Sequence, residues 1–464
     1  MIDINLPLDL DDPEASQFLS GIQGNIIKGH GRDFTAHLIL KMTGDQQTVK
    51  SWIAKFAGEH VTSAAIARRQ TRVWRDVKDK GEPFAMFLLA PDGYRHLGFG
   101  DGQLPGPRND PFTDPSHSQY FPLGMKGQSS VPGRQYNDPP AAQWEPAYQQ
   151  QIDAMVLLAD DDLDRLNQSV RDICASLAGV FELLVAERGK VLRDTFARGK
   201  LDIEHFGFQD GVSQPLMIRQ DIDNEIAKRG STHWNPTAPL WLALVEEPGG
   251  AGGFGSFMVF RKLEQNVKAF WDTLGQLSRQ SGMAVEDLGA MAVGRFRDGT
   301  PAVPTTTIDP KADPNDFHYD QDPAGAKCPF HAHIRKTNPR GDIPRIIGAP
   351  AAFESARRIV RRGITYGERP DLSVRPETGA GLLFMCFQSN LDQFVIQQEG
   401  ADGNDFVNAG DGVDAVIGQN SAAIDQTWPS GGAVKFTMAN LVKMQGGEYF
   451  FAPSIAFLKG LAKP

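Results

Sequence analysis

Residues 154–187 of this chain read AMVLLADDDLDRLNQSVRDICASLAGVFELLVAE. The apolar run 154–159 predicts a buried strand, the spacing of apolar residues over 161–177 predicts an amphipathic helix, and 180–187 predicts a second strand. Three aspartates at 160–162 favour the positive N-terminus of that helix. The stretch therefore predicts a strand–helix–strand unit.

A similar unit is predicted nearer the N-terminus. Residues 37–42 and 85–90 have the composition of short buried strands, and residues 46–56 between them have helical spacing. Two such units are typical of a ferredoxin-like sheet with helices packed on it. We therefore expect residues 1–225 to form an N-terminal ferredoxin-like domain.

The second half of the chain carries elements of the same kinds, although no sequence repeat of fixed period is present. Strands are expected at 240–245, 256–261 and 381–387, with a helix over 264–278. The expected fold class is α+β, with two ferredoxin-like domains that are each an antiparallel sheet with peripheral helices. The second of these domains is expected to span residues 226–464.

Two segments rich in Pro, Gly and Asp interrupt these units. Residues 100–146 can neither continue a helix nor pair centrally in a sheet, which predicts a long surface excursion. Residues 298–329 have a similar composition and predict a loop that leads into a segment containing histidine.

Charge and composition exclude several classes of partner. The 464 residues carry a formal net charge of -10 at pH 7, which weighs against nucleic acid or an anionic membrane as the main partner. Three widely spaced cysteines, Cys174, Cys328 and Cys386, imply no disulfide framework. No secretory signal and no apolar stretch of about 18 residues is visible. We expect a cytoplasmic protein that acts on a small or neutral substrate.

The first candidate site is the segment EHFGFQDGVSQP at residues 204–215, in which two nearby glycines bracket Asp210. Glycine permits positive φ and close approach of the backbone to a flat ligand, so this turn can press a carboxylate against something planar. An aspartate that only shapes a tight turn through its own backbone is the commoner explanation for such a composition. The residues alone leave both interpretations open.

The second candidate is the segment CPFHAHIRKTNPR at residues 328–340, which concentrates histidine, cysteine and cationic side chains. Neutral imidazole binds iron well, and nearby Arg or Lys can pair with haem propionates. Cys328, His331 and His333 as ligands of a transition metal are an alternative, although no second ligand pair of the kind zinc recruits is evident. A polar loop with solvated histidines is the remaining interpretation.

The third candidate is the segment RIVRRGITYG at residues 358–367, where an apolar pair lies inside a basic cluster. An arginine beside a developing oxyanion stabilises it without changing its own protonation. An exposed basic turn that pairs with the excess acidic groups of the chain is the alternative.

Together and in this order, the three segments resemble the dye-decolourising peroxidase family. The Gly-x-x-Asp-Gly turn resembles the family signature, and the ligand segment and the distal arginine segment follow it as they do in the family. The resemblance extends from IQGNIIKGHG at 22–31 to GLLFMCFQ at 381–388. The N-terminal motif and the long insertions are similar to the larger, fungal-like branch.

The resemblance implies a haem peroxidase that reduces hydrogen peroxide and oxidises dyes, phenolics or other organic reductants through a ferryl intermediate. It implies one haem b per chain, held between the two domains in the C-terminal half. Asp210 corresponds to the distal acid, Arg361 to the distal arginine and His333 to the axial ligand of the iron. His331, two positions earlier, keeps a swap of the ligand assignment open.

The resemblance also implies how the haem is surrounded. Arg340 is similar to a propionate partner, and Leu382 and Phe384 would line the distal pocket. The axial imidazole should donate its second ring proton to a carboxylate. Asp405 is the predicted acceptor, and Asp402 is close enough to substitute for it.

Dyes too large to reach a buried haem would be oxidised at the surface through a Tyr or Trp radical. Tyr366, five residues after Arg361, is the leading candidate, and Trp271 and Trp428 are weaker ones. An aspartate as the distal base predicts an acidic pH optimum, because the ordinary pKa of a carboxyl group is about 3.9.

A haem-binding or haem-processing protein without strong peroxidase turnover is the main alternative to the enzyme. The presence of both Asp210 and Arg361 favours the enzyme, because a carrier needs the axial ligand but neither distal group. The expected partners are hydrogen peroxide and an organic reductant, with no nucleic acid and no membrane. The oligomeric state stays open between monomer and dimer.

Overall fold

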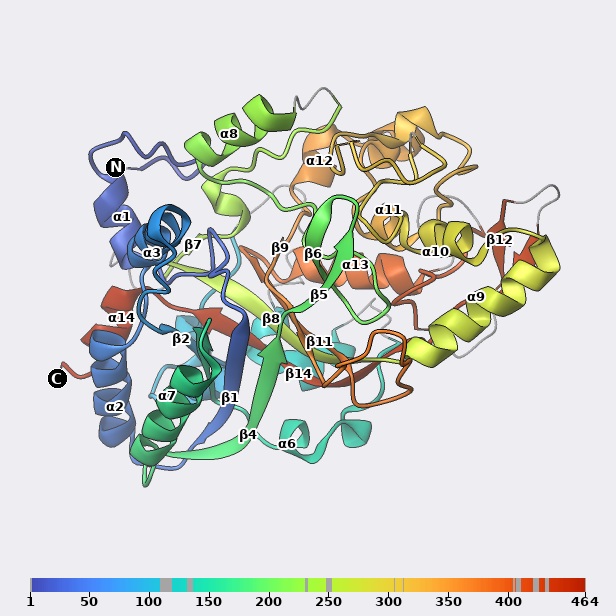
Figure 1. Ribbon diagram of the computed structural model, residues 1–464. Coiled ribbons are helices and arrows are strands. Elements are labelled where there is room, and N and C mark those ends of the chain that lie inside the picture. The colour runs from blue at the N-terminus through green and yellow to red at the C-terminus, as the bar shows by residue number, and fades with distance from the viewer. Residues whose placement is uncertain are drawn as a thin grey trace.

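The fold is built on one antiparallel sheet of ten strands, shown in a computed structural model (Figure 1). The structure describes residues 2–108, 119–131, 137–229, 233–247, 253–303, 305–311, 313–403, 405, 410–419, 425–429 and 434–463. Among these residues, no helix has both the length and the apolar character needed to cross a membrane.

The N-terminal half contributes four strands to the sheet in the order β4–β1–β3–β2. Their bounds are β1 (Phe34–Met42), β2 (Phe84–Leu89), β3 (Ala154–Asp160) and β4 (Phe181–Lys190). The connecting helices are α2 (Gln46–Glu59) and α3 (Ala64–Val77) after β1, and α7 (Leu163–Ser176) after β3. This is the ferredoxin-like order, and both strand–helix–strand units predicted from the sequence are confirmed.

The acidic run before α7 has a local role in starting that helix. The side chain of Asp162 accepts hydrogen bonds from the backbone N–H groups of Asp164 and Arg165. Such an N-cap satisfies donors that have no partner within the helix. Leu166, Val170 and Ile173 then form the buried stripe of the helix, so that its apolar spacing is explained by packing on the sheet.

The C-terminal half repeats this architecture with the strand order β10–β11–β8–β14. The strands are β8 (Phe254–Gln265), β9 (Val360–Arg361), β10 (Ile364–Tyr366), β11 (Gly381–Gln388) and β14 (Val442–Ala452). Helix α9 (Val267–Ser281) follows β8, and helix α13 (Asp392–Asp402) follows β11. The predicted α+β class with ferredoxin-like halves is confirmed.

The two halves share one sheet because β14 pairs with β2 through Phe451 and Leu89. The chain therefore returns to its N-terminal half at its end (Figure 1). The predicted division between residues 225 and 226 falls inside helix α8 (Arg219–Arg229), and the limits of the two domains stay a prediction.

Shorter elements cover the sheet and connect its strands. The short helices are α1 (Ala15–Gly21), α4 (Pro91–His96), α5 (Tyr120–Gly127), α6 (Pro146–Gln149), α10 (Val285–Val293), α11 (His333–Thr337), α12 (Ala351–Ser355) and α14 (Ile455–Gly460). The remaining strands are β5 (Leu192–Phe196), β6 (Gly199–Ile203), β7 (Val245–Glu246), β12 (Gln426–Trp428) and β13 (Val434–Phe436).

Two sequence-based expectations differ from the structure. Residues 240–245 were expected to be a strand, but Leu240–Leu242 form a 3₁₀ turn and only Val245–Glu246 pair with β8. A short apolar run indicates burial and does not determine the backbone conformation.

The segment at 100–146 is more buried than its composition predicts, because Tyr120, Phe121 and Trp144 are buried. Residues 109–118 and 132–136 of that excursion lie outside the described residues.

A second apolar cluster, separate from the main core, lies between α9 and α10 and the turn that carries Asp210. Phe206 stacks on Phe270 of α9 with ring centroids 4.3 Å apart, and Phe208 stacks on Trp271 at 6.3 Å. Stacked aromatic side chains bury much area in a fixed geometry. The turn is therefore anchored by the two phenylalanines that precede Asp210.

Helix α11 is only five residues long and depends on a buried ion pair for its position. Arg335 is fully buried, and its Nε donates to Asp342 Oδ2 at 2.6 Å. The same guanidinium donates to the backbone oxygen of Asp322 at 3.0 Å, while Asp322 Oδ2 accepts from the backbone N–H of Cys328 at 2.8 Å. Arg335 therefore joins the segments before and after the helix that presents His333.

Replacing Asp342 with asparagine should destabilise the protein, because it leaves the Arg335 charge buried without its main partner. We expect Asp342→Asn to lower the free energy of unfolding by about 3–5 kcal/mol, measured by guanidinium denaturation followed by tryptophan fluorescence. Asp272→Asn removes an exposed ion pair to Lys268 and serves as a control that should change the midpoint little. Equal midpoints for the two variants would contradict this role of Arg335.

Candidate active site

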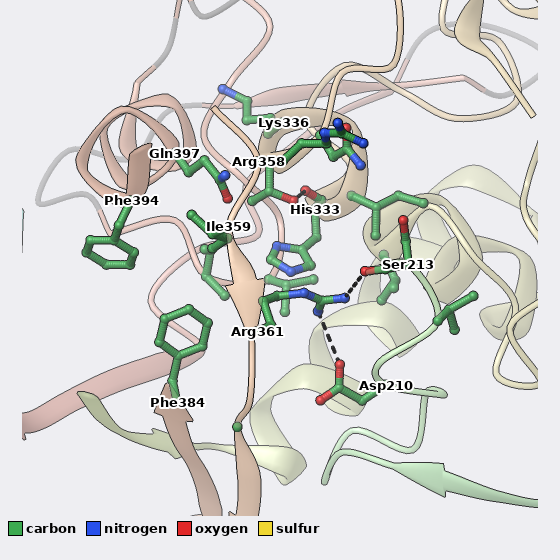
Figure 2. Close-up of a pocket in the computed structure, with 18 of the residues that line it drawn as sticks. Asp210, Ser213, His333, Lys336, Arg358, Ile359, Arg361, Phe384, Phe394 and Gln397 are labelled. Atoms are coloured by element: carbon green, nitrogen blue, oxygen red, sulfur yellow. Dashed lines mark hydrogen bonds and ion pairs between the residues drawn. The ribbon is translucent and has the colours of Figure 1, made fainter. Parts of the chain in front are cut away.

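A cavity of about 470 Å³ lies against the C-terminal half of the sheet. Its walls come from β8 and β11, from the turn around Asp210, from α11, and from the segment between α12 and β9. This volume lies within the range of small-molecule and cofactor sites. Figure 2 shows side chains from β11, the Asp210 turn, α11 and the segment between α12 and β9 converging on one space.

Asp210 and Arg361 face each other on one side of the cavity. Arg361 NH1 donates to Asp210 Oδ1 at 3.2 Å, and its NH2 donates to the backbone oxygen of Ser213 at 3.1 Å (Figure 2). The backbone N–H of Gly211 donates to the same Asp210 oxygen at 2.6 Å. About a third of each side chain is exposed, 35% for Arg361 and 34% for Asp210. The two charges are therefore held together but stay accessible to a ligand.

The turn before Asp210 is closed by the carboxylate of Glu204. Its Oε2 accepts from the backbone N–H of Phe206 at 2.8 Å, and its Oε1 accepts from that of Phe208 at 2.9 Å. Gln265 Nε2 donates to Oε2 as a third partner at 2.5 Å. Burial raises the pKa of Glu204, and these three donors offset part of that rise. Sequence reasoning gave this residue no role.

Gly207 at the tip of this turn has a φ of +98°, a conformation that glycine adopts without steric cost. Its backbone oxygen accepts from Arg297 Nε at 3.1 Å. The glycine before Asp210 is thus required by the geometry of the turn.

His333 lies across the cavity from this pair, at the start of α11. Its Nδ1 is 2.8 Å from Asp414 Oδ2, and Asp414 is fully buried. A carboxylate acceptor keeps the proton on Nδ1 and leaves the Nε2 lone pair for a ligand. Burial lowers the pKa of His333, but the Asp414 carboxylate outweighs it, and the net pKa is raised. The ring points toward Arg361 in Figure 2.

The acceptor of His333 is therefore Asp414, which corrects the prediction of Asp405. Asp405 is exposed, and its Oδ1 accepts from the backbone N–H of Gly410 at 2.6 Å. The alternative, Asp402, accepts from the backbone N–H of Gln419 at 2.7 Å, and burial raises its pKa to about 6. Both carboxylates stabilise their own loop. No feature of the sequence indicated Asp414. It lies 81 positions after His333 and approaches it only in the folded chain.

His331 does not line the cavity, whereas His333 does. Its ring packs on Trp428 with centroids 4.5 Å apart, and burial lowers its pKa to about 3. Cys328 is buried with its Sγ 3.9 Å from Tyr319 Oη. Within the part of the chain that the structure describes, no three His, Cys, Asp or Glu side chains are grouped to hold a metal ion. The alternative of a metal site at Cys328, His331 and His333 receives no support.

Arg340 lines the cavity as a buried cation. It is 2% exposed, its guanidinium lies 4.3 Å from the Trp234 ring centroid, and it donates to Asn315 Oδ1 at 2.6 Å and to Ser213 Oγ at 3.0 Å. No carboxylate in the described residues forms an ion pair with it. Burial, and then the nearby charge of Arg295, lower the pKa of Arg340 to about 9. A buried cation without an anion favours an anionic ligand.

The rest of the lining is largely apolar. Leu382 and Phe384 are alternate residues of β11 and both line the cavity, as Ile359, Val416 and Ile417 do. A flat apolar ring with acidic substituents satisfies this combination of an imidazole, apolar walls and an unpaired buried guanidinium. The residues present therefore fit a haem.

The predicted surface oxidation sites lie elsewhere. Tyr366 pairs with Gly381 across β10 and β11, so its side chain lies on the opposite face of the sheet from Leu382. There Lys262 Nζ lies 5.2 Å from the Tyr366 ring centroid. Trp271 and Trp428 are buried in the second apolar cluster. None of the three aromatic residues lines the cavity.

Comparisons with known proteins identify relatives of this chain. No protein-family model matches the chain. The multifunctional dye peroxidase of Amycolatopsis sp. is 38% identical in an alignment of 477 positions that covers 97% of each chain. A dye-decolorizing peroxidase of Auricularia auricula-judae is 30% identical and covers 67% of this chain.

Among solved structures, a DyP-type peroxidase from Anabaena sp. superposes with a TM-score of 0.89 at 39% identity and covers 99% of both chains. The chain therefore belongs to the dye-decolourising peroxidase family, and it is a haem-dependent peroxidase.

Proposed function

We propose that this chain reduces hydrogen peroxide with Asp210 and Arg361 as its catalytic pair, and that His333 would bind the iron of one haem b per chain. Dyes, phenolics or other organic reductants supply the electrons. The observation that carries the proposal is the contact between Asp210 and Arg361, placed across the cavity from the His333 ring (Figure 2).

Different residues around the cavity would bind different parts of the haem. A bound haem supplies the iron and conjugated ring that give two electrons to hydrogen peroxide and regain them from reductants one at a time. His333 would hold it through Nε2, because Nδ1 is engaged by Asp414. Arg340 would face an acidic substituent, and Leu382 and Phe384 would face the apolar ring.

Asp210 would move the proton that peroxide reduction requires. Its Oδ1 is engaged by Gly211 and Arg361, whereas Oδ2 accepts no hydrogen bond from the described residues. Oδ2 is thus the atom available to take a proton from one peroxide oxygen and return it to the other, so that water leaves. Arg361 would stabilise the anionic peroxide while remaining protonated.

A haem carrier without turnover is not favoured. The chain keeps both distal groups, and the relatives that match almost its full length are named peroxidases. Binding and release of haem require an axial ligand and a cavity but no proton shuttle.

The division of labour between the two distal residues can be measured directly. We expect Arg361→Leu to lower kcat/KM for hydrogen peroxide about 100- to 1,000-fold and Asp210→Asn about 100- to 10,000-fold. The measurement is the stopped-flow change of the Soret band at equal haem content. If Arg361→Leu alone slows the reaction, Asp210 has only a hydrogen-bonding role.

The pH profile of the same enzymes is a second readout. Wild-type turnover of a small phenol should be highest in the acid range, because a carboxylate base stays ionised where a histidine would be protonated. Asp210→Asn should remove that acid maximum. A wild-type activity that rises steadily to about pH 8 would contradict a carboxylate base.

Asp414 should tune the cofactor through His333. Asp414→Asn replaces a charged acceptor with a neutral one, so the imidazole becomes less electron-rich and the reduction potential of the bound haem should rise. The measurement is a spectroelectrochemical titration. Asp405→Asn is the matched control and should leave the potential unchanged, since its carboxylate lies outside the cavity lining. A shift in the control alone would return Asp405 to the proximal role.

Tyr366 is proposed as the site where bulky dyes are oxidised. Because its side chain lies on the face of the sheet away from the cavity, a dye at Tyr366 needs no access to the haem. Tyr366→Phe should therefore reduce turnover of a bulky anthraquinone dye several-fold and leave turnover of a small phenol unchanged. Equal losses for the two substrates would rule out the relay.

A further inference from the structure

We propose that Glu204 is a positioning residue that fixes Asp210 by filling the turn before it with a carboxylate. The inference rests on the proposed role of Asp210 in proton transfer. Glu204 is itself one of the residues that line the cavity, and the positioning role needs no contact between its carboxylate and peroxide or haem. It acts through the backbone of residues 204–208, which ends two positions before the catalytic carboxylate.

The path of the backbone shows why one side chain can set the position of Asp210. Ile203 and Gln209 form an antiparallel bridge, and the backbone N–H of Asp210 donates to the oxygen of Asp202 at 3.1 Å. Residues 204–208 form the loop that this bridge closes. The conformation of the loop therefore decides where the chain re-enters the bridge and where the Asp210 side chain points.

Within that loop, the Glu204 carboxylate supplies the hydrogen-bond acceptors that backbone N–H groups in a tight loop otherwise lack. The backbone N–H groups of Phe206 and Phe208 both donate to it, one to each oxygen. The loop also closes on itself through Glu204 N to Phe208 O at 3.1 Å and Gly207 N to Glu204 O at 2.9 Å. Buried N–H groups without acceptors are costly, so the carboxylate selects this loop conformation.

The surroundings of Glu204 make the carboxylate hard to replace. Gln265 Nε2 donates to it from β8, and the charges of Asp210 and Arg369 interact with it. Arg369 in turn donates to the backbone oxygen of His205 within the loop. A glutamine at 204 keeps the shape but offers only one oxygen, so its amide NH₂ must face one of the donors.

The first experiment is a double-mutant cycle between Glu204 and Asp210. Glu204→Gln should lower kcat/KM for hydrogen peroxide about 10- to 100-fold, the cost of misplacing a reacting group by about 1 Å. In the Asp210→Asn background, the same substitution should change the rate by less than about twofold. General damage to the fold would instead produce the same loss in both backgrounds.

Glu247→Gln is the matched control for the cycle. Glu247 is another buried glutamate that caps a backbone N–H, that of Ser454, but it lies outside the cavity lining. Its substitution should leave kcat/KM for peroxide unchanged. Should Glu204→Gln fail to fold, Gln265→Met removes one donor to the carboxylate without changing the loop, and its smaller loss should also vanish in the Asp210→Asn background.

Hydrogen exchange gives a readout that does not depend on turnover. In the haem-free chain, Glu204→Gln should increase amide exchange in the peptide spanning 204–211, while peptides from β8 and β11 keep their protection. Faster exchange across the whole protein would show a structural role only and overturn the proposal.

The possible results separate this inference from the proposed function. Slow turnover of Asp210→Asn together with a fully active Glu204→Gln removes the role of Glu204 and leaves Asp210 in place. Equal losses in both backgrounds also remove it. An Asp210→Asn enzyme as fast as the wild type removes the role of Asp210 and, with it, the reason for positioning that residue.

Discussion

The hydrogen bond between His333 and Asp414 is the contact on which one whole side of the cavity depends. It joins two segments 81 residues apart and decides which ring nitrogen faces the ligand. A short helix cannot supply this precision alone. Arg335 therefore holds α11 in place through its ion pair with Asp342. Lys336 holds it as well, because its Nζ donates to the backbone oxygens of Gly400 at 3.1 Å and Gly403 at 2.6 Å. Those carbonyls lie at the C-terminal end of α13, where a cation is favoured.

The distal side follows a different principle. Asp210 lies on a turn that is joined to strand β6 through its backbone N–H, which donates to the oxygen of Asp202 at 3.1 Å. Its position comes from backbone hydrogen bonds that converge on the Glu204 carboxylate and from the stacking of Phe206 on Phe270. Burying a carboxylate there is costly, as the raised pKa of Glu204 shows. That cost is consistent with a site in which the position of the Asp210 side chain matters more than the stability of the turn.

The order of elements and the motifs were predictable from the sequence, but the partners of the site residues were not. Periodicity located the strand–helix–strand units because burial repeats along an element. A hydrogen bond across a loop leaves no such pattern, so Asp405 and Asp414 could not be told apart by spacing. Glu204 stood within the quoted motif, yet its contacts appear only once the loop closes on it. The apolar run at 240–245 was expected to be a strand for a different reason, because a short apolar run indicates burial and leaves the backbone conformation undecided.

The sheet also acts as a partition between the haem cavity and the face that carries Tyr366. Strand β11 presents Leu382 to the cavity, while its neighbour Gly381 pairs with Tyr366, so in the proposed relay an electron would cross one strand. On the Tyr366 face, Lys262 is held by Glu145 at 2.8 Å and Glu187 at 2.9 Å. Burial and three glutamates raise the pKa of Tyr366, so the phenol is neutral and protonated at rest. The excess of carboxylates around it favours a positive charge developing on the ring, which is the electrostatic condition that loss of an electron requires.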